Sequence, residues 1–392
     1  MSTLQIPEFP PVLKQIGFRP QAAAKLKPGE THEQKITQKF DLNNFLWVSP
    51  KIDGIRALFI PGIGFFSREL KPIRNQHLQR FAQCEVVSEL MGIDSVFTFG
   101  LPSVFVVLDG ELTWGHSNPS KNQDGTFQHT TSAVMSFSPD EKYCEPGSIH
   151  FTVFDAFLYH PERGSASKDV LDTIPKMQHH EPYEKRCDLS SGLVSLLQAA
   201  QKRIEGELGS SPITLVDIMT ESDVVNPKIY KNPQEVWEAI QVKETKYLEQ
   251  GYEGMMIRCS KAPYKFGRGT WIDSTLAAIK RFADGEAEII GMEELMYNNN
   301  PAEQSNHGLQ VRGKSKEYLE PANMLGRLVV RGITEPFIGK EFRIGTGFTR
   351  DQRHEYWDNK EKYLNKVVTY RYQDAGIKDL PRILSFKGFR ED

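Results

Sequence analysis

One hexapeptide, Lys51-Ile-Asp53-Gly54-Ile-Arg56, constrains the fold of this chain more than any other stretch. It follows Pro50 and an apolar run over residues 46–49 that predicts a strand. The fold must therefore bring a lysine, an aspartate and an arginine into one pocket at a strand end, with Gly54 permitting a tight turn. A lysine becomes a nucleophile when low polarity or nearby cations lower the pKa of its amine. The simpler interpretation is a solvated ion pair in a surface turn.

Carboxylates flank two other apolar runs. Residues 106–108 lead into Asp109-Gly110-Glu111, and Gly251-Tyr252-Glu253-Gly254 leads into Met255-Met256-Ile257-Arg258. Carboxylates at a strand end are suitable ligands for Mg²⁺ or partners for a ribose hydroxyl. Taken alone, each stretch is explained equally well as an ordinary strand-to-loop cap.

Three further stretches carry groups suited to a nucleotide. Phe154 lies in a strand-like run, 151–155, where its ring could stack on a base, although core packing is the commoner role of such a residue. Residues 264–269 form a cationic, glycine-containing loop of the kind that suits phosphate. Residues 278–287 carry Lys280 and Arg281 beside apolar neighbours.

Composition excludes several classes of protein. The chain has 392 residues, enough for two or three domains, and 25% of them are charged. No apolar run approaches the roughly 18 residues that a membrane helix needs. The N-terminus lacks a signal-peptide pattern, so we expect a cytoplasmic protein with no membrane partner. The four cysteines are far apart, so we expect free thiols rather than a zinc site or a disulfide framework.

The charge is unevenly distributed. Residues 301–392 hold 17 Lys+Arg and 13 Asp+Glu, a net of +4, so the other 31 and 38 give residues 1–300 a net of -7. A basic C-terminal part joined to an acidic body fits a polyanion-binding appendage on a catalytic body. Chance variation of surface charge is the alternative.

The apolar pattern divides the chain into three parts. We predict an N-terminal arm over 1–45 with a short helix at 34–40, an α/β part over 46–283 and a β-rich part over 284–392. The α/β part has strand-like runs at 46–49, 57–60, 64–67, 105–108 and 150–157, polar loops at 115–129 and 161–182, and helical spacing over 74–92 and 191–208. Short runs at 287–290, 326–331, 342–344 and 367–372 predict a small barrel such as an OB-fold.

Order and spacing together make these weak signals specific. The series resembles the nucleotidyltransferase motifs of the covalent superfamily of ATP-dependent DNA ligases, RNA ligases and mRNA-capping enzymes. It is most similar to the small ATP-dependent DNA ligases of viruses and phages, over about residues 45–392. The supporting stretches are SPKIDGIR, FSRELKPIRN, FQHTTSAVMS, GYEGMMIR, YKFGRGT, FRIGTGFTRDQR and PRILSFKGFRED. The resemblance implies an α/β (α+β), ATP-grasp-like nucleotidyltransferase domain followed by a β-barrel OB-fold domain.

The resemblance also implies an activity. Lys51 would attack the α-phosphate of ATP and expel pyrophosphate, with Mg²⁺ offsetting phosphate charge. The bound AMP would pass to the 5′-phosphate at a nick in duplex DNA, and the 3′-hydroxyl would then displace it. The implied partner is nicked duplex DNA, encircled by a monomer.

Site residues follow from matching positions to the family motifs. The implied catalytic residues are Lys51, Asp53, Arg56 and Lys280, and the implied metal ligands are Glu253 and Glu111. Nucleotide contacts fall on Pro50, Lys51, Arg56, Arg68, Glu111, Phe154, Met256, Lys280, Arg382 and Arg390, with core filling as the alternative for Met256. DNA contacts fall on Arg56, Arg68, Lys265, Arg268, Arg312, Lys314 and Lys316.

The polar stretch over 297–325 lies where this family can carry a hairpin latch that wraps the duplex. Arg312, Lys314 and Lys316 alternate along it, which predicts three cations on one face of a strand. Such contacts to phosphate are independent of base sequence and sensitive to salt. The alternative is a disordered polar insertion.

Position 278 departs from the family pattern, because alanine replaces the first lysine of a Lys-x-Lys motif. Three explanations stay open: a Lys→Ala change introduced to trap an intermediate, a natural variant that uses Lys280, Lys261 or Arg281 instead, or a degenerate ligase that binds DNA without sealing it. The C-terminal stretch PRILSF also lacks the usual second proline.

Competing functions share part of this chemistry. An RNA ligase or an mRNA-capping guanylyltransferase would use the same lysine, and the latter would require GTP. A catalytically lost nick-binding protein is the non-enzymatic alternative. The intact set of Lys51, Asp53, Glu111 and Glu253 argues against that alternative.

Overall fold

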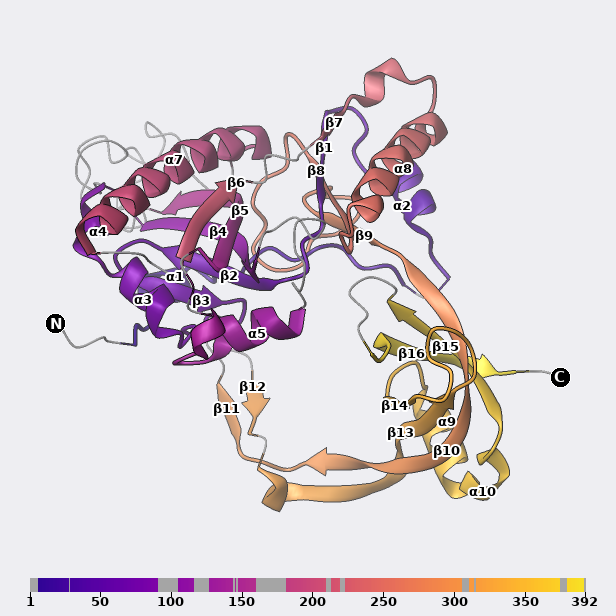
Figure 1. Cartoon of the computed structure of the whole chain (residues 1–392). Helices are drawn as coiled ribbons and strands as arrows, with labels where there is room; N and C mark the ends of the chain where they lie inside the picture. The colour runs from indigo at the N-terminus through magenta and orange to yellow at the C-terminus, as the bar shows by residue number, and fades with distance from the viewer. Residues whose placement is uncertain are drawn as a thin grey trace. The chain divides into compact units, whose positions relative to one another are not determined.

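The structure is a computed structural model of the whole chain. It describes residues 6–27, 29–90, 105–115, 127–143, 145, 147–159, 181–208, 213–218, 223–304, 310–313, 315–373 and 379–390. The chain divides into two compact units, Met1–Ile279 and Lys280–Asp392 (Figure 1). This division falls just before the boundary between 283 and 284 that the sequence predicts.

A five-stranded sheet forms the larger half of the first unit. Its order is β3 (Gly64–Ser67), β2 (Ile55–Ile60), β4 (Phe105–Trp114), β5 (Ile149–Tyr159) and β6 (Ile213–Ile218), antiparallel except for the parallel pair β5–β6. The long helix α7 (Tyr183–Leu208) lies along this sheet (Figure 1). Shorter helices are α3 (Gln76–Ala82), α4 (Glu85–Leu90), α5 (Phe127–Met135) and the 3-10 turn η2 (Glu141–Tyr143).

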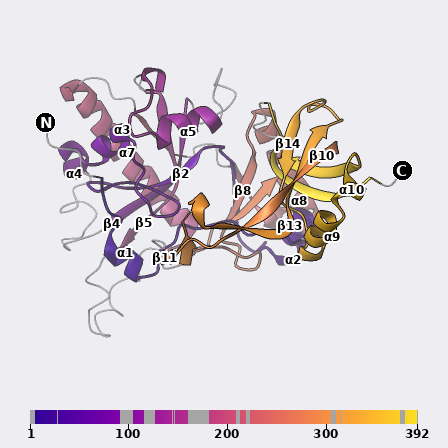
Figure 2. The same ribbon diagram turned by 90° about the horizontal axis from the view of Figure 1, so that it is seen from below.

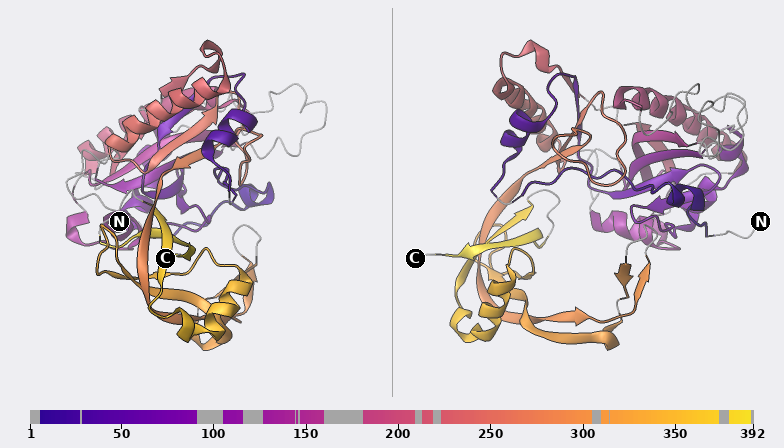
Figure 3. Two further views of the ribbon diagram at one scale, coloured as in Figure 1. Left: turned by 90° about the vertical axis from the view of Figure 1, so that its right-hand side faces the viewer. Right: turned by 180° about the vertical axis from the view of Figure 1, so that it is seen from behind.

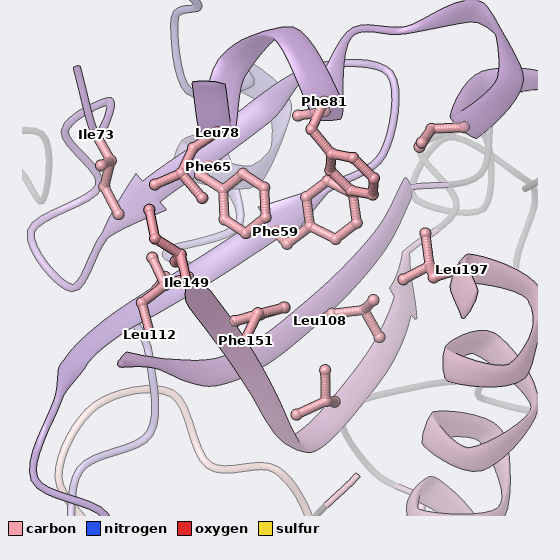
Figure 4. Close-up of a cluster of buried hydrophobic side chains, with 14 of the residues drawn as sticks. Phe59, Phe65, Ile73, Leu78, Phe81, Leu108, Leu112, Ile149, Phe151 and Leu197 are labelled. Carbon is pink, nitrogen blue, oxygen red and sulfur yellow. The ribbon is translucent and has the colours of Figure 1, made fainter. Parts of the chain in front are cut away.

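Aromatic residues fill the core beneath this sheet. Phe59 and Phe65 face each other across β2 and β3 with ring centroids 4.5 Å apart, and the Phe151 ring meets Phe65 edge-on at 5.3 Å (Figure 4). Leu197 of α7 reaches the same cluster. This core fixes β2, β4 and β5, the strands that carry Arg56, Glu111 and Phe154.

A four-stranded sheet forms the other half of the first unit. Its order is β7 (Asp223–Val225), β1 (Leu46–Pro50), β8 (Gly254–Cys259) and β9 (Ala277–Lys280). Helices α2 (His32–Lys39) and α8 (Pro233–Glu249) lie side by side against it, with the 3-10 turn η4 (Pro227–Ile229) before α8 (Figure 3). Side chains alternate along β8, so that Met255 and Ile257 enter the core under the helices while Met256 and Arg258 lie on the opposite face.

The first 45 residues lie within the first unit. Helix α1 (Pro11–Gln15) brings Phe9 and Phe18 into a core with Phe66 and Tyr264. Further along, the amide of Ala22 donates to the carbonyl of Gly267 at 2.7 Å. The segment is therefore bonded to the cationic loop 264–269 and carries part of the core.

The second unit is built on a five-stranded antiparallel sheet. Its order is β14 (Glu341–Ile344), β13 (Leu319–Gly332), β10 (Phe282–Asn298), β15 (Val367–Gln373) and β16 (Arg382–Phe389). Among the described residues this sheet does not close into a barrel, although just beyond β14 the Phe386 amide donates to the Thr346 carbonyl at 2.9 Å. Helices α9 (Arg350–Asp358) and α10 (Lys360–Tyr363) follow β14 (Figure 2).

Strands β10 and β13 continue beyond the sheet as a two-stranded ribbon (Figure 3). At its end are β11 (Ala302–Gln304), β12 (Gln310–Arg312) and the 3-10 turn η5 (Lys316–Tyr318). The described parts of 297–325 thus form a hairpin. The prediction of three cations on one strand face is wrong, because β12 ends at Arg312 and Lys316 begins a 3-10 turn. Lys314 lies outside the described residues.

Two further expectations concern membrane-spanning helices and the cysteines. No helix among the described residues is long and apolar enough to cross a membrane. Cys84, Cys187 and Cys259 carry free thiols, as expected, and Cys144 lies outside the described residues.

Candidate active site

The pairing of β1 with β8 sets Lys51 beside Glu253. Pro50 pairs with Met255, and the ladder continues past the strand end through the Lys51 amide, which donates to the Gly254 carbonyl at 2.9 Å. The Glu253 amide in turn donates to the Lys51 carbonyl at 3.2 Å. The Lys51 ammonium then forms an ion pair with the buried Glu253 carboxylate. Two residues far apart in sequence thus meet by strand register.

The charge around Lys51 keeps its amine protonated. Burial lowers the pKa of Lys51, but the carboxylates of Glu253 and Glu111 outweigh this effect, with a further contribution from Asp53, and raise the pKa above its usual value. The described residues around Lys51 therefore do not supply the lowered pKa that a nucleophilic lysine needs. Lys51 becomes a nucleophile only when positive charge neutralises these carboxylates.

Glu111 is the titrating group of the site. Burial raises the pKa of its carboxyl to about 7, although Lys51 and Arg56 act in the opposite direction. The carboxyl lies opposite Arg56, because β4 pairs with β2 in that register. Near neutral pH it is therefore divided between an acid that can donate a hydrogen bond and a carboxylate that can bind a metal.

Two motif glycines lie where the backbone of a neighbouring strand leaves no room for a side chain. A Cβ on Gly54 would lie 2.4 Å from the Leu112 carbonyl oxygen, and a Cβ on Gly110 would lie 2.4 Å from the Thr152 carbonyl oxygen. Neither glycine has a positive φ. The chain does bend at Gly54, as the sequence predicts, and the close approach of β4 is a further reason why this position is glycine.

Arg56 is fixed by a buried network. Its Nε and Nη2 donate to the two carboxylate oxygens of Asp109 at 2.8 and 2.5 Å, and its Nη1 donates to the Gln21 carbonyl. The Tyr264 hydroxyl donates to Asp109 at 2.5 Å and accepts from the Gln21 amide at 3.2 Å. Burial raises the pKa of Tyr264, so its hydroxyl remains a donor. The sequence analysis considered Asp109 as a metal or ribose ligand, whereas its carboxylate is bound by Arg56 and Tyr264. It assigned no individual role to Tyr264 or Gln21.

Phe154 and Met256 are half-buried, as a base-stacking surface requires. The Arg56 guanidinium lies 5.3 Å and the Arg258 guanidinium 5.5 Å from the centroid of the Phe154 ring. Met255, and not Met256, belongs to the core beneath the four-stranded sheet. The core-filling alternative for Met256 is therefore not favoured.

A second buried ion pair supports Phe154 from behind. Asp155 accepts from Arg186 Nε at 2.8 Å and from Nη2 at 3.1 Å, and both residues are about fully buried. Arg186 Nη1 also donates to the carbonyls of Glu181 and Ala262. The pair thus links β5, α7 and the loop after β8. An aspartate inside an apolar strand was the signal for it, and the sequence analysis missed this signal.

The remaining predicted residues are spread over both units, and several are already bonded. Lys265 pairs with Asp273, and Arg268 Nη1 donates to the Ala23 carbonyl at 2.8 Å. In the second unit, Arg312 Nη1 donates to the Asn300 carbonyl at 2.6 Å, and Arg390 pairs with Glu286 at 3.0 Å. Arg68 is exposed just after β3, Pro50 is buried at the end of β1, and Arg382 begins β16 half-buried.

Position 278 lies on the same face of β9 as Lys280. Ala277 and Ile279 enter the core, so Ala278 lies on the opposite face, which is also the face of the sheet that carries Met256. The Lys280 ammonium donates to the buried Gln373 amide oxygen at 3.2 Å. A lysine at 278 would therefore extend from the face that carries the nucleotide-contact candidates.

The donor set fits a magnesium ion. Mg²⁺ is usually held by one or two carboxylates, with water and substrate phosphates as the other ligands. Glu253 pairs with the Lys51 ammonium, and Glu111 also acts electrostatically on it, so two carboxylates lie in the surroundings of Lys51. Among the described residues no group of three His, Cys, Asp or Glu side chains could hold a metal by itself.

Known proteins share both the C-terminal domain and the overall fold of this chain. Residues 320–390 match the family model of the DNA ligase OB-like domain. A Lig E DNA ligase structure is similar over 95% of this chain and 99% of its own, with 18% identity and a TM-score of 0.53. The structure described as Pmar-Lig_Pre is similar over 95% and 67%, with 19% identity and a TM-score of 0.59. The chain has the fold of a DNA ligase.

A DNA ligase fold accounts for both units. It confirms the predicted nucleotidyltransferase and OB-like domains, and the predicted resemblance to DNA ligases. The Chlorella virus DNA ligase-adenylate is also similar, at 26% identity over 95% of this chain and 99% of its own, with a TM-score of 0.41. No curated protein matches the sequence significantly.

Proposed function

We propose that this protein is an ATP-dependent DNA ligase that seals 5′-phosphate/3′-hydroxyl nicks through a lysyl-AMP intermediate on Lys51 and an adenylated DNA intermediate. The observation that carries the proposal is the ion pair of Lys51 with Glu253, with Glu111 beside it, in a chain with the ligase fold. A lysine held among carboxylates needs a cation to become a nucleophile, and ATP is used as its magnesium complex.

The first step is a substitution at phosphorus. The Lys51 amine forms a bond to the α-phosphorus of ATP, the bond to the pyrophosphate oxygen breaks, and the proton of the ammonium leaves to solvent. Glu253 and Glu111 would hold Mg²⁺, which supplies positive charge that lowers the pKa of Lys51 and offsets phosphate charge. Arg56, fixed by Asp109, presents its remaining donors without reorganisation. Phe154 and Met256 offer their half-buried side chains to the adenine.

DNA binding is assigned to the second unit as well as to the site. The β11–β12 hairpin and its supporting ribbon carry Arg312 and Lys316, exposed cations that can contact phosphate without base preference. Arg312 also donates a hydrogen bond to the Asn300 carbonyl, so it stabilises the hairpin in addition to its proposed contact with phosphate. Encirclement of the duplex by a single chain remains part of the proposal.

One experiment tests the proposed activity. The protein is incubated with Mg²⁺, labelled ATP or GTP, and a duplex with one 5′-phosphorylated nick, and protein and nucleic acid are then resolved. We expect ATP to label the wild type and not Lys51→Ala, with sealing of the nick. Labelling by GTP would instead indicate a capping enzyme, and sealing confined to an RNA nick would indicate an RNA ligase. Binding of the nick with no labelling would leave a nick-binding protein.

Position 278 is tested in the same assay. Ala278→Lys restores a cation on the site face of β9, so we expect it to speed at least one step by about tenfold or more, since each 1.36 kcal/mol of barrier is tenfold in rate. Accumulation of labelled protein or adenylated DNA in the wild type, relieved by Ala278→Lys, would locate the affected step. Equal rates in both proteins would show that the other cations of the site suffice.

A further inference from the structure

A closed ring of hydrogen bonds joins Arg56 to the N-terminal segment. Arg56 donates to both carboxylate oxygens of Asp109, and Asp109 accepts from the Tyr264 hydroxyl at 2.5 Å. That hydroxyl accepts from the Gln21 amide at 3.2 Å, and the Gln21 carbonyl accepts from Arg56 Nη1, which completes the ring. Asp109, Tyr264 and Gln21 are at most 1% exposed, so water does not replace a lost member of the ring.

The ring uses only part of the Arg56 guanidinium. A guanidinium has five N–H groups, and the ring binds one each on Nε, Nη2 and Nη1. One N–H group on Nη1 and one on Nη2 therefore remain available to a ligand. The Arg56 side chain is 17% exposed, and its Cζ lies 5.3 Å from the centroid of the Phe154 ring. The available donors thus lie beside the proposed base-stacking surface.

The two segments that close the ring are bonded to each other. The Ala22 amide donates to the Gly267 carbonyl at 2.7 Å, and the Gly269 amide donates to the Ala22 carbonyl at 2.8 Å. The residue next to Ala22 is Gln21, and Tyr264 begins the loop that contains both glycines. The Tyr264 hydroxyl therefore connects Asp109 to a frame of paired backbone. Such a frame holds a side chain more precisely than a flexible loop does.

We propose that Tyr264 is a positioning residue whose hydroxyl, by holding Asp109 to the N-terminal segment, sets the direction in which Arg56 donates to a phosphate of its substrate. The inference rests on the proposed function for the identity of the ligand, which is a phosphate of the nucleotide or the 5′-phosphate of the nick. Two N–H groups of one guanidinium bind phosphate oxygens in a fixed geometry, so a change in direction costs rate. Tyr264 itself is too deeply buried to contact the substrate.

The kinetic test uses Tyr264→Phe, which removes only the hydroxyl. We expect the rate of at least one step at saturating substrate to fall about tenfold, with KM changed by less than about threefold. The two steps measured are labelling of Lys51 by ATP and sealing of a pre-adenylated nick. A loss confined to labelling indicates that Arg56 meets a nucleotide phosphate, and a loss confined to sealing indicates the nick phosphate.

Two comparisons separate positioning from a loss of stability. In an Arg56→Lys background, Tyr264→Phe should cause no further loss of rate, because a lysine has no planar group to direct. The matched control is Tyr247→Phe, because the Tyr247 hydroxyl is also buried and donates to the Val48 carbonyl at 3.3 Å. It should lower the melting temperature without changing either rate. Equal losses of rate in both backgrounds, or in both phenylalanine variants, would overturn the inference.

A second measurement does not depend on activity. The 15Nε–1H signal of Arg56, identified by its absence from Arg56→Lys, reports exchange of the bound proton with solvent. We expect exchange at least about tenfold faster in Tyr264→Phe and unchanged in Tyr247→Phe, and unchanged exchange in both would show that the inference is wrong. If exchange behaves as expected but ATP does not label the wild type, the positioning of Arg56 stands and the proposed function fails.

Discussion

Charge at single residues decides what this site can do without ligands. Lys51 is placed for attack but kept protonated by the carboxylates that are expected to receive Mg²⁺. On the proposed function, substrate arrival and activation of the nucleophile would be one event, because a cation that accompanies ATP would also release the lysine from Glu253. This coupling would limit unproductive reaction of the amine.

Glu111 predicts a pH dependence of stability. The pKa of its carboxyl is about 7 in the folded protein against 4.5 for the ordinary group. Between these pH values the folded chain keeps a proton that the unfolded chain has lost, so stability falls as the pH rises through this window. Glu111→Gln cannot ionise, so its free energy of unfolding relative to wild type should increase by roughly 2–3 kcal/mol from pH 5 to pH 8. Urea unfolding at both pH values measures this, and parallel changes in both proteins would contradict it.

The close approach at Gly110 predicts a large effect of a single methyl group. Gly110→Ala sets a Cβ against the Thr152 carbonyl, which is backbone and cannot move aside, so we expect a loss of about 2 kcal/mol or more. Gly192→Ala is the matched control, because nothing lies within 4 Å of its Cβ inside α7. It should stabilise the chain by about 1 kcal/mol. Thermal unfolding compares them, and equal effects would refute the steric argument.

At the scale of elements, one buried ion pair organises the surroundings of Phe154. Asp155 on β5 and Arg186 on α7 are paired, and Arg186 also binds the Ala262 carbonyl beyond β8. Strand, helix and loop are therefore held to one another by a single guanidinium. Because Asp155 is the neighbour of Phe154 on β5, this arrangement fixes the strand at the position of Phe154.

Breaking this pair should be costly. Asp155→Ala leaves Arg186 buried without a counter-charge, and we expect a loss of about 3–5 kcal/mol in the free energy of unfolding. The double variant Asp155→Leu, Arg186→Met removes both charges and should recover much of that loss. A double-mutant cycle in urea measures the coupling. Additive losses would show that the two residues act independently.

The sequence predicted elements with regular alternation and missed those shaped by tertiary contact. The run at 64–67 coincides with β3, because its apolar residues and flanking turn signals are local. Strand β16 was missed: Ile383 has a φ of 51° and the register with β15 shifts, so no simple alternation marks it. The cation stripe over 312–316 failed because β12 ends early.

The site was predictable to the extent that its motifs are contiguous. Lys51, Glu111 and Glu253 were each identified from neighbouring residues, and the structure brings their charges together. Tyr264, Arg186 and Arg258 were not assigned roles. What matters about each is its partner, and such contacts join residues as far as 243 positions apart.

On the scale of the whole molecule, the candidate active site and the hairpin proposed to bind DNA lie in different units. The first unit holds Lys51, Glu111 and Glu253, and the second holds the β11–β12 hairpin. Each unit encloses a core of its own, with Leu108 buried in one and Leu328 in the other. Separate cores are expected to open separately, because local unfolding follows the packing within a cooperative unit.

Hydrogen exchange tests this independence. Leu108→Ala and Leu328→Ala each remove a fully buried side chain, at an expected cost of about 2–5 kcal/mol to the unit that contains it. Peptides from 1–279 should exchange faster in Leu108→Ala alone, and peptides from 280–392 in Leu328→Ala alone. Faster exchange of both units in either variant would mean that the chain unfolds as one body. Independent units would let the second be redesigned for DNA contact without disturbing the ion pair that holds Lys51.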